Sequence, residues 1–378
     1  NGDLIKARSL NLPILKRAEI LARLFNEYYG IAIAGTSGKS TITAMVGHIL
    51  TRAGLDPTVV NGAPMKNFLL NGQPNNIHTG LSNMMVIESD ESDGSIIHYR
   101  PALSLIHTIS KDHQEIPELL KLFQIFAGHT REKVIINADC PYAGSLTLKA
   151  SGITTYSLEK DSSYRAQLLH LEPFDSTFEC RGQRFHLSVP GIYNVSNALA
   201  SLVIAAHLGL SWSDIQSGLE TFQGISRRFE LVGEARGIRV IDDFAHNPQK
   251  ITAALRAASG TGSRRILVFQ PHGYGPIRFL KEELAEAFAS EMSDHDILFI
   301  PEVYYAGGTA SRDISSRDLV NSITKRGRDA RYGESRESLL KSLIEESRSG
   351  DTILVMGARD DTITSFCRKI LHRLEEET

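Results

Sequence analysis

Apolar and polar residues alternate along this chain in a pattern that predicts strands and helices in turn. Short apolar runs, which are typical of buried strands, are followed by longer segments whose apolar residues recur at helical spacing. The runs that predict strands lie at 31–34, 84–89, 103–109, 134–139, 237–245, 264–271, 296–302 and 351–358. Strands that alternate with helices in this way predict an α/β fold with a mostly parallel, doubly wound sheet.

Three segments depart from this pattern. Residues 151–190 contain short alternating runs without an intervening helix, which predict a small antiparallel sheet. Residues 51–83 are rich in Gly, Asn and Pro and predict loops and short strands. Residues 1–28 predict a helix, a short strand and another helix, a piece too small to bury much apolar surface alone.

These patterns predict three parts of the chain. Residues 1–28 are expected to be the remnant of an N-terminal domain whose front is missing. Residues 29–228 are expected to form a central domain that combines the mostly parallel sheet with the small antiparallel one. Residues 229–378 are expected to form a Rossmann-like α/β domain, with the junction in the stretch GISRRFE.

The composition narrows the classes of function. A net charge of −3 over 378 residues gives no general attraction to nucleic acid or to an anionic membrane surface. No apolar run approaches the length of a membrane span. The three cysteines Cys140, Cys180 and Cys367 lack metal-binding or redox spacing, which favours a reducing compartment. We therefore expect a cytoplasmic protein.

The sequence GTSGKS at 35–40 predicts a phosphate-binding loop. It lies between a predicted strand and a predicted helix, so backbone N–H groups and the positive end of the helix dipole point at one spot. A standard Walker loop has a glycine where Ile33 stands, so this is a shorter form that Gly35 closes. Lys39 is expected to reach the terminal phosphates, and the Ser40 hydroxyl to hold Mg²⁺. The residues expected to bind the nucleotide are Gly35, Thr36, Ser37, Gly38, Lys39, Ser40 and Thr41.

Acidic residues follow the predicted strand at 84–89. Because Mg²⁺ takes one or two carboxylates together with water and phosphate oxygens, Glu88 and Glu91 are both candidate ligands. His113 follows the next predicted strand, at the edge where open α/β sheets bind ligands. The alternatives are a solvated acidic turn and a structural histidine.

Asn194 and Asn197 lie one helical turn apart at the start of a long apolar helix. An asparagine amide offers the donor and the acceptor that pair with an adenine edge, although Asn194 is equally suited to cap the helix. In the second half, polar clusters at 271–274, 302–312 and 357–361 each follow a predicted strand. They predict a second ligand-binding edge.

Together these motifs resemble the Mur ligases, the ATP-dependent amide-bond synthetases of peptidoglycan precursor assembly. Six motifs occur in the order and spacing of that family: GTSGKST, ESDESDGS, the histidine of KDH, G-x-x-N-x-x-N-A-L, RRFE and DDFAHNP. The resemblance implies an ATP- and Mg²⁺-dependent carbon–nitrogen ligase that works through an acyl phosphate and releases ADP and phosphate. It also implies a UDP-binding domain ahead of 1–28, so the chain is either a fragment or a homologue without that domain.

Within the family, ESDESD, FQPH and VYYAG resemble the branch that joins L-alanine to UDP-N-acetylmuramate, and more loosely the branch that recycles a tripeptide. The chain also departs from the family pattern. Tyr193 stands where histidine is usual. In addition, 273–277 intervenes before Arg278, where the alanine-adding branch carries an arginine-rich run that helps to hold the amino acid, and this second departure leaves the acceptor open. The rival interpretations are another acceptor and a truncated homologue that binds ATP without ligation. The short loop argues against a kinase or GTPase.

The resemblance also implies roles for single residues. The catalytic residues would be Lys39, His113, Arg228 and His246. The metal ligands would be Ser40 with Thr41, and His113 with either Glu88 or Glu91.

On the same resemblance, Asn194 and Asn197 would take adenine and Asp243 would contact the ribose. Arg228 would neutralise phosphate charge, and His246 would lie near the phosphates or the acyl intermediate. The expected partners are a UDP-N-acetylmuramate-type nucleotide sugar and an amino acid or short peptide, with the oligomeric state left open.

Overall fold

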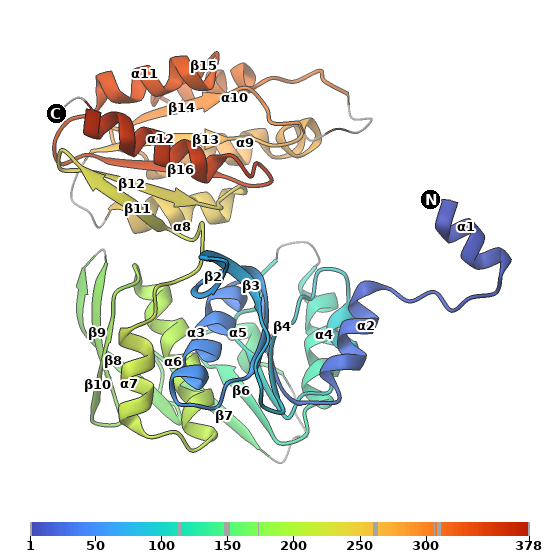
Figure 1. Cartoon of the computed structure of the whole chain (residues 1–378). Helices are drawn as coiled ribbons and strands as arrows, with labels where there is room; N and C mark the ends of the chain where they lie inside the picture. Colours follow the sequence, from blue (N-terminus) through green and yellow to red (C-terminus); the bar gives the residue numbers. More distant parts are fainter. Residues whose placement is uncertain are drawn as a thin grey trace. The chain divides into compact units, whose positions relative to one another are not determined.

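The computed structural model describes residues 2–111, 115–146, 152–172, 174–259, 264–305, 307 and 311–376. The chain folds into two compact units, Asn1–Ser226 and Arg227–Thr378, each built on its own sheet (Figure 1). The predicted α/β fold is confirmed in both units. The assignment of 1–28 to a separate domain stays a prediction.

The first unit is built on a ten-stranded sheet with the order β10-β9-β8-β7-β6-β5-β1-β4-β2-β3. β1 lies in parallel between β4 and β5, so that Ile33 pairs with Glu88 and Ala34 with Ile106. The carboxyl ends of three strands therefore meet at one edge. The strands are β1 Tyr29–Ala34, β2 Thr58–Leu70, β3 Gln73–His78, β4 Met84–Glu88, β5 Leu103–Ile106, β6 Lys133–Asn137, β7 Ile153–Ser157, β8 Tyr164–Glu172, β9 Asp175–Cys180 and β10 Gln183–Leu187.

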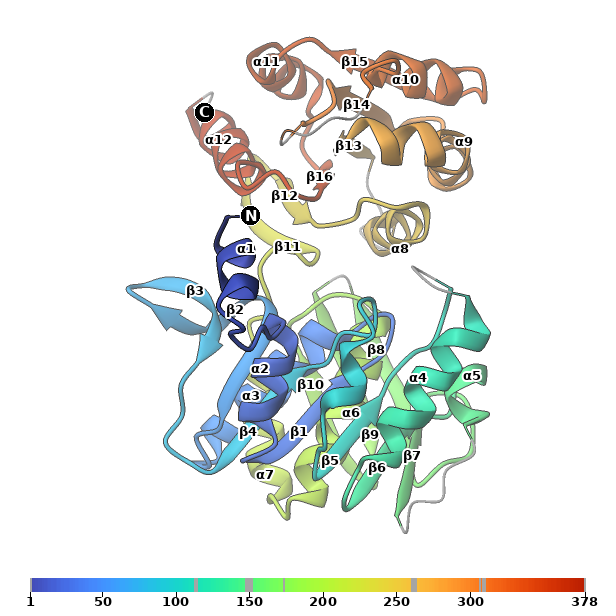
Figure 2. The ribbon, with the colours of Figure 1, turned by 90° about the vertical axis from the view of Figure 1, so that its right-hand side faces the viewer.

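Helices cover both faces of this sheet, because the central strands are apolar on both sides. Ile31 and Ile33 of β1 belong to a core with α3, α6 and α7, whereas Ala32 and Ala34 belong to a core with α2 and α4 (Figures 1 and 2). The helices of this unit are α1 Gly2–Ser9, α2 Arg17–Phe25, α3 Lys39–Arg52, the 3₁₀-helix η1 Ser95–His98, α4 Ile116–Gly128, α5 Pro141–Gly144, α6 Ile192–His207 and α7 Trp212–Glu220.

The structure corrects the sequence prediction in three places. The predicted antiparallel strands exist, but β8, β9 and β10 extend the edge of the main sheet through a short parallel pairing of β7 with β8. Within residues 51–83, β2 and β3 pair as an antiparallel hairpin, and β2 is longer than the predicted short strands. The described residues between α1 and α2 contain no strand, since Pro13 lacks an N–H donor and Leu12 and Ile14 are exposed.

The second unit has a six-stranded sheet with the order β11-β12-β16-β13-β14-β15. All its pairings are parallel except that of β11 with β12, and one face packs against α11 and α12 (Figure 1). The elements are β11 Glu230–Ala235, β12 Ile238–Asp243, α8 Pro248–Ser259, β13 Arg265–Gln270, α9 Tyr274–Glu291, β14 Ile297–Pro301, α10 Ser316–Thr324, β15 Asp329–Gly333, α11 Arg336–Glu346, β16 Thr352–Gly357 and α12 Ile363–Glu376. No helix in the described part of either unit has the length and apolar character needed to cross a bilayer.

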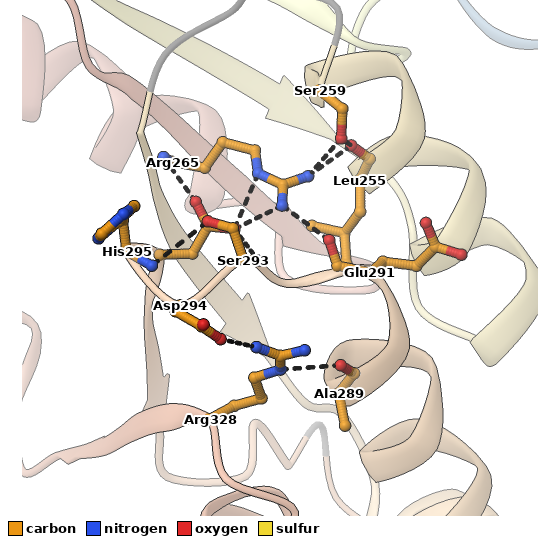
Figure 3. Close-up of polar contacts among 10 residues, drawn as sticks. Leu255, Ser259, Arg265, Ala289, Glu291, Ser293, Asp294, His295 and Arg328 are labelled. Carbon is orange, nitrogen blue, oxygen red and sulfur yellow. Dashed lines mark hydrogen bonds and ion pairs between the residues drawn. The ribbon is translucent and has the colours of Figure 1, made fainter.

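A buried arginine fastens the amino edge of this second sheet. The Arg265 guanidinium forms an ion pair with Asp296 and donates to the Leu255 carbonyl (2.8 Å), the Ser259 hydroxyl (2.7 Å) and the Glu291 carbonyl (2.7 Å) (Figure 3). These partners come from α8, α9 and the turn before β14. Since each side of the guanidinium has a partner, the charge is compensated, and the arginine joins four segments.

Candidate active site

The glycine loop lies between β1 and α3, as the sequence predicts. Gly38 adopts φ 82° as the N-cap of α3, a left-handed conformation that favours glycine. A Cβ on Gly35 would lie 2.9 Å from the backbone of Thr108, so only glycine fits there. The N–H groups of residues 39–41 precede the first intrahelical bond of α3, which leaves them available to an anion at the helix N-terminus.

The start of the loop is fastened to the segment that follows β5. The Thr36 N–H donates to the Thr108 carbonyl (2.8 Å), and the Ser37 N–H donates to the Thr108 hydroxyl (3.1 Å). The Ser110 N–H donates to the Thr36 hydroxyl (3.0 Å). Thr36 and Ser37, which the sequence placed among the nucleotide-binding residues, thus use their backbone donors inside the protein. These two residues therefore attach the loop to the segment that follows β5.

Lys39 forms a buried ion pair in front of the loop. Its Nζ lies 2.8 Å from Glu91 and 3.5 Å from Asp90, and the side chains of Lys39 and Glu91 are only 11% and 4% exposed. Burial disfavours the charge of Lys39, yet the Glu91 carboxylate raises its pKa. Burial also raises the pKa of Glu91, although Lys39 opposes this shift. Two carboxylates thus lie near one ammonium group.

The two glutamates that the sequence could not separate have different surroundings. Glu88 accepts a hydrogen bond from the Gly62 N–H (2.8 Å), whereas Glu91 lies against Lys39. Ser40 is buried in the first turn of α3, next to Lys39 in the chain. His113 lies outside the described residues, and the described part contains no group of three or more His, Cys, Asp and Glu side chains placed to hold a metal. The metal site therefore stays a prediction, with Glu91 as the carboxylate beside the loop.

Asn194 and Asn197 form a buried relay at the start of α6. Asn194 donates to the Pro190 carbonyl (2.7 Å) and accepts from the Asn197 amide (2.9 Å). The Asn197 Oδ1 is buried and has no hydrogen-bond partner among the described residues. It lies 2.8 Å from the place where a Cβ on Gly38 would stand. Asn197 thus lies beside the glycine loop, and Asn194 orients it from the preceding turn of α6.

In the second unit, the predicted residues gather at the carboxyl end of β12. The Asp243 carboxylate accepts from the Phe229 N–H and the Ala245 N–H, both at 2.7 Å. Burial raises the pKa of Asp243, and the nearby Arg228 opposes that shift. The Arg228 guanidinium lies 5.5 Å from the ring centroid of Phe244. Asp243 and Arg228 are therefore neighbours of opposite charge.

His246 completes this edge. Its Nδ1 lies 2.8 Å from the Phe244 carbonyl oxygen, and burial lowers its pKa to about 4. The imidazole is therefore neutral at neutral pH, with Nδ1–H donating and Nε2 left as an acceptor. The ring of His272, whose pKa is also lowered by burial, lies 5.6 Å away. His272 follows β13, so two strand ends contribute to the edge.

Sequence reasoning missed several residues that hold these edges. Arg227, next to the predicted Arg228, donates to the Gly357 carbonyl (2.6 Å) and to Asp242 (3.3 Å), and it adopts φ 59°. His107 and Tyr156 form a buried pair under the glycine loop. The only sequence signal for Arg227 was its place in a pair of basic residues before an aromatic one. His107 gave no signal, because a histidine in an apolar segment is typical of an ordinary core.

Known proteins resemble the chain along nearly its whole length. Residues 33–205 match the family profile "Mur ligase middle domain", and residues 227–359 match "Mur ligase, glutamate ligase domain". A UDP-N-acetylmuramate–L-alanine ligase of Geotalea daltonii is 36% identical over 372 residues, covering 95% of this chain and 79% of that protein. The protein of the same name from Pelotomaculum thermopropionicum is 35% identical over 391 residues, covering 100% and 82%.

Solved structures show the same similarity. The crystal structure of a UDP-N-acetylmuramate–alanine ligase from Thermotoga maritima superimposes with a TM-score of 0.79 at 25% identity, covering 100% of this chain and 83% of that one. A murein peptide ligase from Psychrobacter arcticus superimposes with a TM-score of 0.67 at 22% identity, which shows the shared fold.

Proposed function

Because the chain belongs to the Mur ligase family, whose members are ATP-dependent ligases of peptidoglycan precursors, we propose that it joins L-alanine to UDP-N-acetylmuramate. The observation that carries the chemistry is the buried Lys39–Glu91 pair at the N-terminus of α3. The choice of acceptor is supported by the relatives, which are named for L-alanine and match over nearly the whole chain.

The reaction needs a carboxylate to be activated, since oxide is a very poor leaving group. Transfer of the γ-phosphoryl group of ATP to the substrate carboxylate forms an acyl phosphate and ADP. The amine of the amino acid then attacks the acyl carbon, a C–N bond forms, and inorganic phosphate and a proton leave. In such a reaction the protein mainly positions groups and neutralises charge.

Lys39 changes partner in this proposal. When the triphosphate enters, the ammonium group leaves Glu91 and binds the β- and γ-phosphates, alongside the free N–H groups of residues 39–41. Glu91 and the Ser40 hydroxyl are hard oxygen donors that fit Mg²⁺, and His113 would join them. The metal would supply charge neutralisation on the phosphates. Glu88 keeps its bond to Gly62 and holds the end of β4 in place.

In this proposal the second unit carries three side chains suited to bind parts of a nucleotide, those of Asp243, Arg228 and His246. Each Asp243 oxygen already accepts one backbone N–H, but a carboxylate has lone pairs left for the ribose hydroxyls. Arg228, free of a carboxylate hydrogen bond in the described residues, offers its guanidinium to phosphate oxygens. The neutral His246 presents Nε2 as an acceptor near the phosphates or the acyl intermediate. Asn197 Oδ1 accepts from the adenine amine.

The proposed partners are the nucleotide sugar, ATP and L-alanine. Since these are metabolites of the cytoplasm, we place the protein there. The tripeptide-recycling activity and ATP binding without ligation are the competing functions. The murein peptide ligase resembles this chain in fold at 22% identity, whereas the L-alanine ligases reach 36%.

Phosphate release tests the proposal directly. The protein is incubated with ATP, Mg²⁺ and UDP-N-acetylmuramate, together with each amino acid or with the tripeptide L-Ala-D-Glu-diaminopimelate. We expect release that depends on both the nucleotide sugar and L-alanine. Phosphate release in a reaction without UDP-N-acetylmuramate, for example with ATP and Mg²⁺ alone, would indicate simple hydrolysis of ATP. Turnover with the tripeptide only would identify the recycling activity, and ADP binding without any turnover would contradict ligation.

A further inference from the structure

A buried histidine supports the glycine loop from within the first unit. His107 follows β5 directly and is 4% exposed. A Cβ on Gly38 would lie 2.6 Å from its Cδ2 and 3.0 Å from its Nε2. The edge of the imidazole therefore packs against the Cα of Gly38, the residue that caps α3.

Tyr156 of β7 fixes the state of this histidine. Its hydroxyl lies 2.5 Å from His107 Nδ1, and the two rings are nearly parallel, at 12° with centroids 6.1 Å apart. Burial raises the pKa of Tyr156, so the phenol keeps its proton, and burial lowers the pKa of His107 to about 4, so the ring is neutral. Among the described residues the hydroxyl bonds only to His107, so it donates to Nδ1. The ring proton then sits on Nε2, the atom beside Gly38.

Asn197 stands beside the same carbon of the loop. Its Oδ1, which is unpaired in the described part of the chain, lies 2.8 Å from the place of a Cβ on Gly38. The relay through Asn194 to the Pro190 carbonyl determines that Oδ1, and not the amide nitrogen, faces the loop. A donor from the segment after β5 and an acceptor from α6 therefore both lie beside the place where a Gly38 side chain would stand.

The neighbours of His107 fasten the residues that precede Gly38. Thr108 accepts the N–H groups of Thr36 and Ser37, and Ser110 donates to Thr36. The segment 107–110 thus contacts three residues of the loop in succession. His107 differs from the other two because it reaches the glycine through which the loop enters α3.

We propose that His107 is a positioning residue for the nucleotide: it holds Gly38 so that the N–H groups of Lys39, Ser40 and Thr41 converge on the phosphates. Gly38 has a wide choice of backbone conformations, and a loop that is already ordered loses less entropy when the ligand binds. The inference rests on ATP binding at this loop, as proposed above. It does not depend on which amine is the acceptor.

The experiment measures ADP–Mg²⁺ binding by calorimetry, with no other substrate present, and KM and kcat for ATP in the ligation assay. The variants are His107→Leu, His107→Gln and Tyr156→Phe in the full chain. His48→Leu is the matched control, because His48 is also buried, also has a pKa of about 4 and also makes one side-chain hydrogen bond, to Thr221 (2.9 Å). It lies within α3 but outside the loop.

We expect His107→Leu to weaken ADP binding about tenfold and to raise KM for ATP similarly, with kcat within about twofold. His107→Gln keeps an N–H donor and should restore most of the affinity. Tyr156→Phe releases the ring and should weaken binding about threefold. His48→Leu should lower the melting temperature without changing the affinity for ADP.

Two results would overturn the proposal. One is wild-type ADP affinity in a folded His107→Leu protein. The other is an equal loss of affinity in His107→Leu and His48→Leu, since that would reflect general destabilisation. If His107→Leu does not fold, unchanged ADP binding by Tyr156→Phe would overturn the inference in the same way. Failure to use L-alanine would contradict the proposed function but would leave these ADP titrations intact.

Discussion

Two buried ion pairs, one in each unit, show how a structural contact differs from a binding site. Lys39–Glu91 and Arg265–Asp296 both exclude water, with side-chain exposures of 11% and 4% in the first and 5% and 1% in the second. Besides its ion pair with Asp296, the Arg265 guanidinium donates three hydrogen bonds to α8 and α9, and its charge is balanced by one carboxylate (Figure 3). Lys39 meets two carboxylates and little else in the described residues.

The two pairs differ in whether the cation can change its partner. Replacement of any Arg265 partner would leave a buried donor unpaired, so the arginine is fixed. Lys39 sits at a helix N-terminus with free N–H groups and two carboxylates near it. In the proposed reaction, the ammonium group would leave Glu91 for a phosphate, and Mg²⁺ would take its place beside the Glu91 carboxylate. A buried ion pair whose carboxylates have lone pairs left over, at the carboxyl edge of a sheet, is typical of a ligand-binding site.

The largest effect is expected from Lys39→Ala. Loss of the charge that stabilises the transferred phosphoryl group should reduce turnover by about 10³- to 10⁵-fold. The measurement is phosphate release with saturating substrates, and circular dichroism should show an intact fold. An Ala variant that keeps its activity would mean that the phosphates bind elsewhere, and the comparison of the two pairs would then fail.

Arg265→Met tests the other member of the comparison. Removal of one partner leaves Asp296 buried without its cation, so the unfolding free energy of the second unit should fall by about 3–5 kcal/mol. Urea unfolding followed by circular dichroism reports both units, whereas the single tryptophan, Trp212, reports the first unit alone. The Trp212 transition and the kcat of the folded fraction should not change.

The control for this prediction is the double variant Arg265→Met with Asp296→Asn. Since it removes both charges but keeps a side-chain oxygen for the backbone N–H groups of residues 265 and 293, it should recover a large part of the lost stability. A loss of ligation activity out of proportion to the unfolded fraction would contradict a purely structural role for Arg265.

Glu91→Gln should have a smaller effect than Lys39→Ala. The amide still accepts a hydrogen bond from Lys39 but is a poor Mg²⁺ ligand, so the Mg²⁺ concentration needed for half-maximal activity should rise about 10- to 100-fold. Glu88→Gln is the matched control, since its oxygen can still accept the Gly62 N–H. If the Glu88 variant shows the larger Mg²⁺ dependence, the assignment of the two glutamates is reversed.

Local signals made much of this site predictable, and distant contacts set the rest. The strand, the glycines at 35 and 38 and the helix that begins at Lys39 lie within one short stretch, so the sequence alone predicts the loop. Glu88 and Glu91 differ only through partners that lie far away in the chain, Gly62 and Lys39. No sequence pattern could therefore have distinguished them.

The same limit explains the errors in the fold. The run at 12–15 is apolar enough for a strand, but a strand also needs a neighbour, and Pro13 lacks a donor. The antiparallel strands β8, β9 and β10 were visible as alternation, yet only the pairing of Tyr156 with Tyr164 shows that they continue the main sheet. His107 could not be recognised as a support from the sequence because its partner Tyr156 belongs to β7 and the glycine that it contacts, Gly38, lies far away in the chain.

The smallest effect concerns acid stability, and it shows that burial alone does not mark a site. His48 and His107 have folded-state pKa values of about 4 against an ordinary 6.5. The unfolded chain therefore binds more protons in this interval, so stability is fully present above about pH 6.5 and is lost as the pH falls towards 4. Between about pH 7 and pH 5, each histidine should account for about 1–2 kcal/mol of the lost unfolding free energy.

Urea titrations followed by Trp212 fluorescence test this prediction. The difference in unfolding free energy between pH 7 and pH 5 should be reduced by a similar amount in His48→Leu and in His107→Leu. Only His107→Leu is expected to bind ADP more weakly. An equal change in the pH dependence of the unfolding free energy, together with unequal ADP affinities, would distinguish a histidine of the core from one that supports the loop. If the pH dependence is unchanged in both variants, neither ring stays neutral in the folded protein.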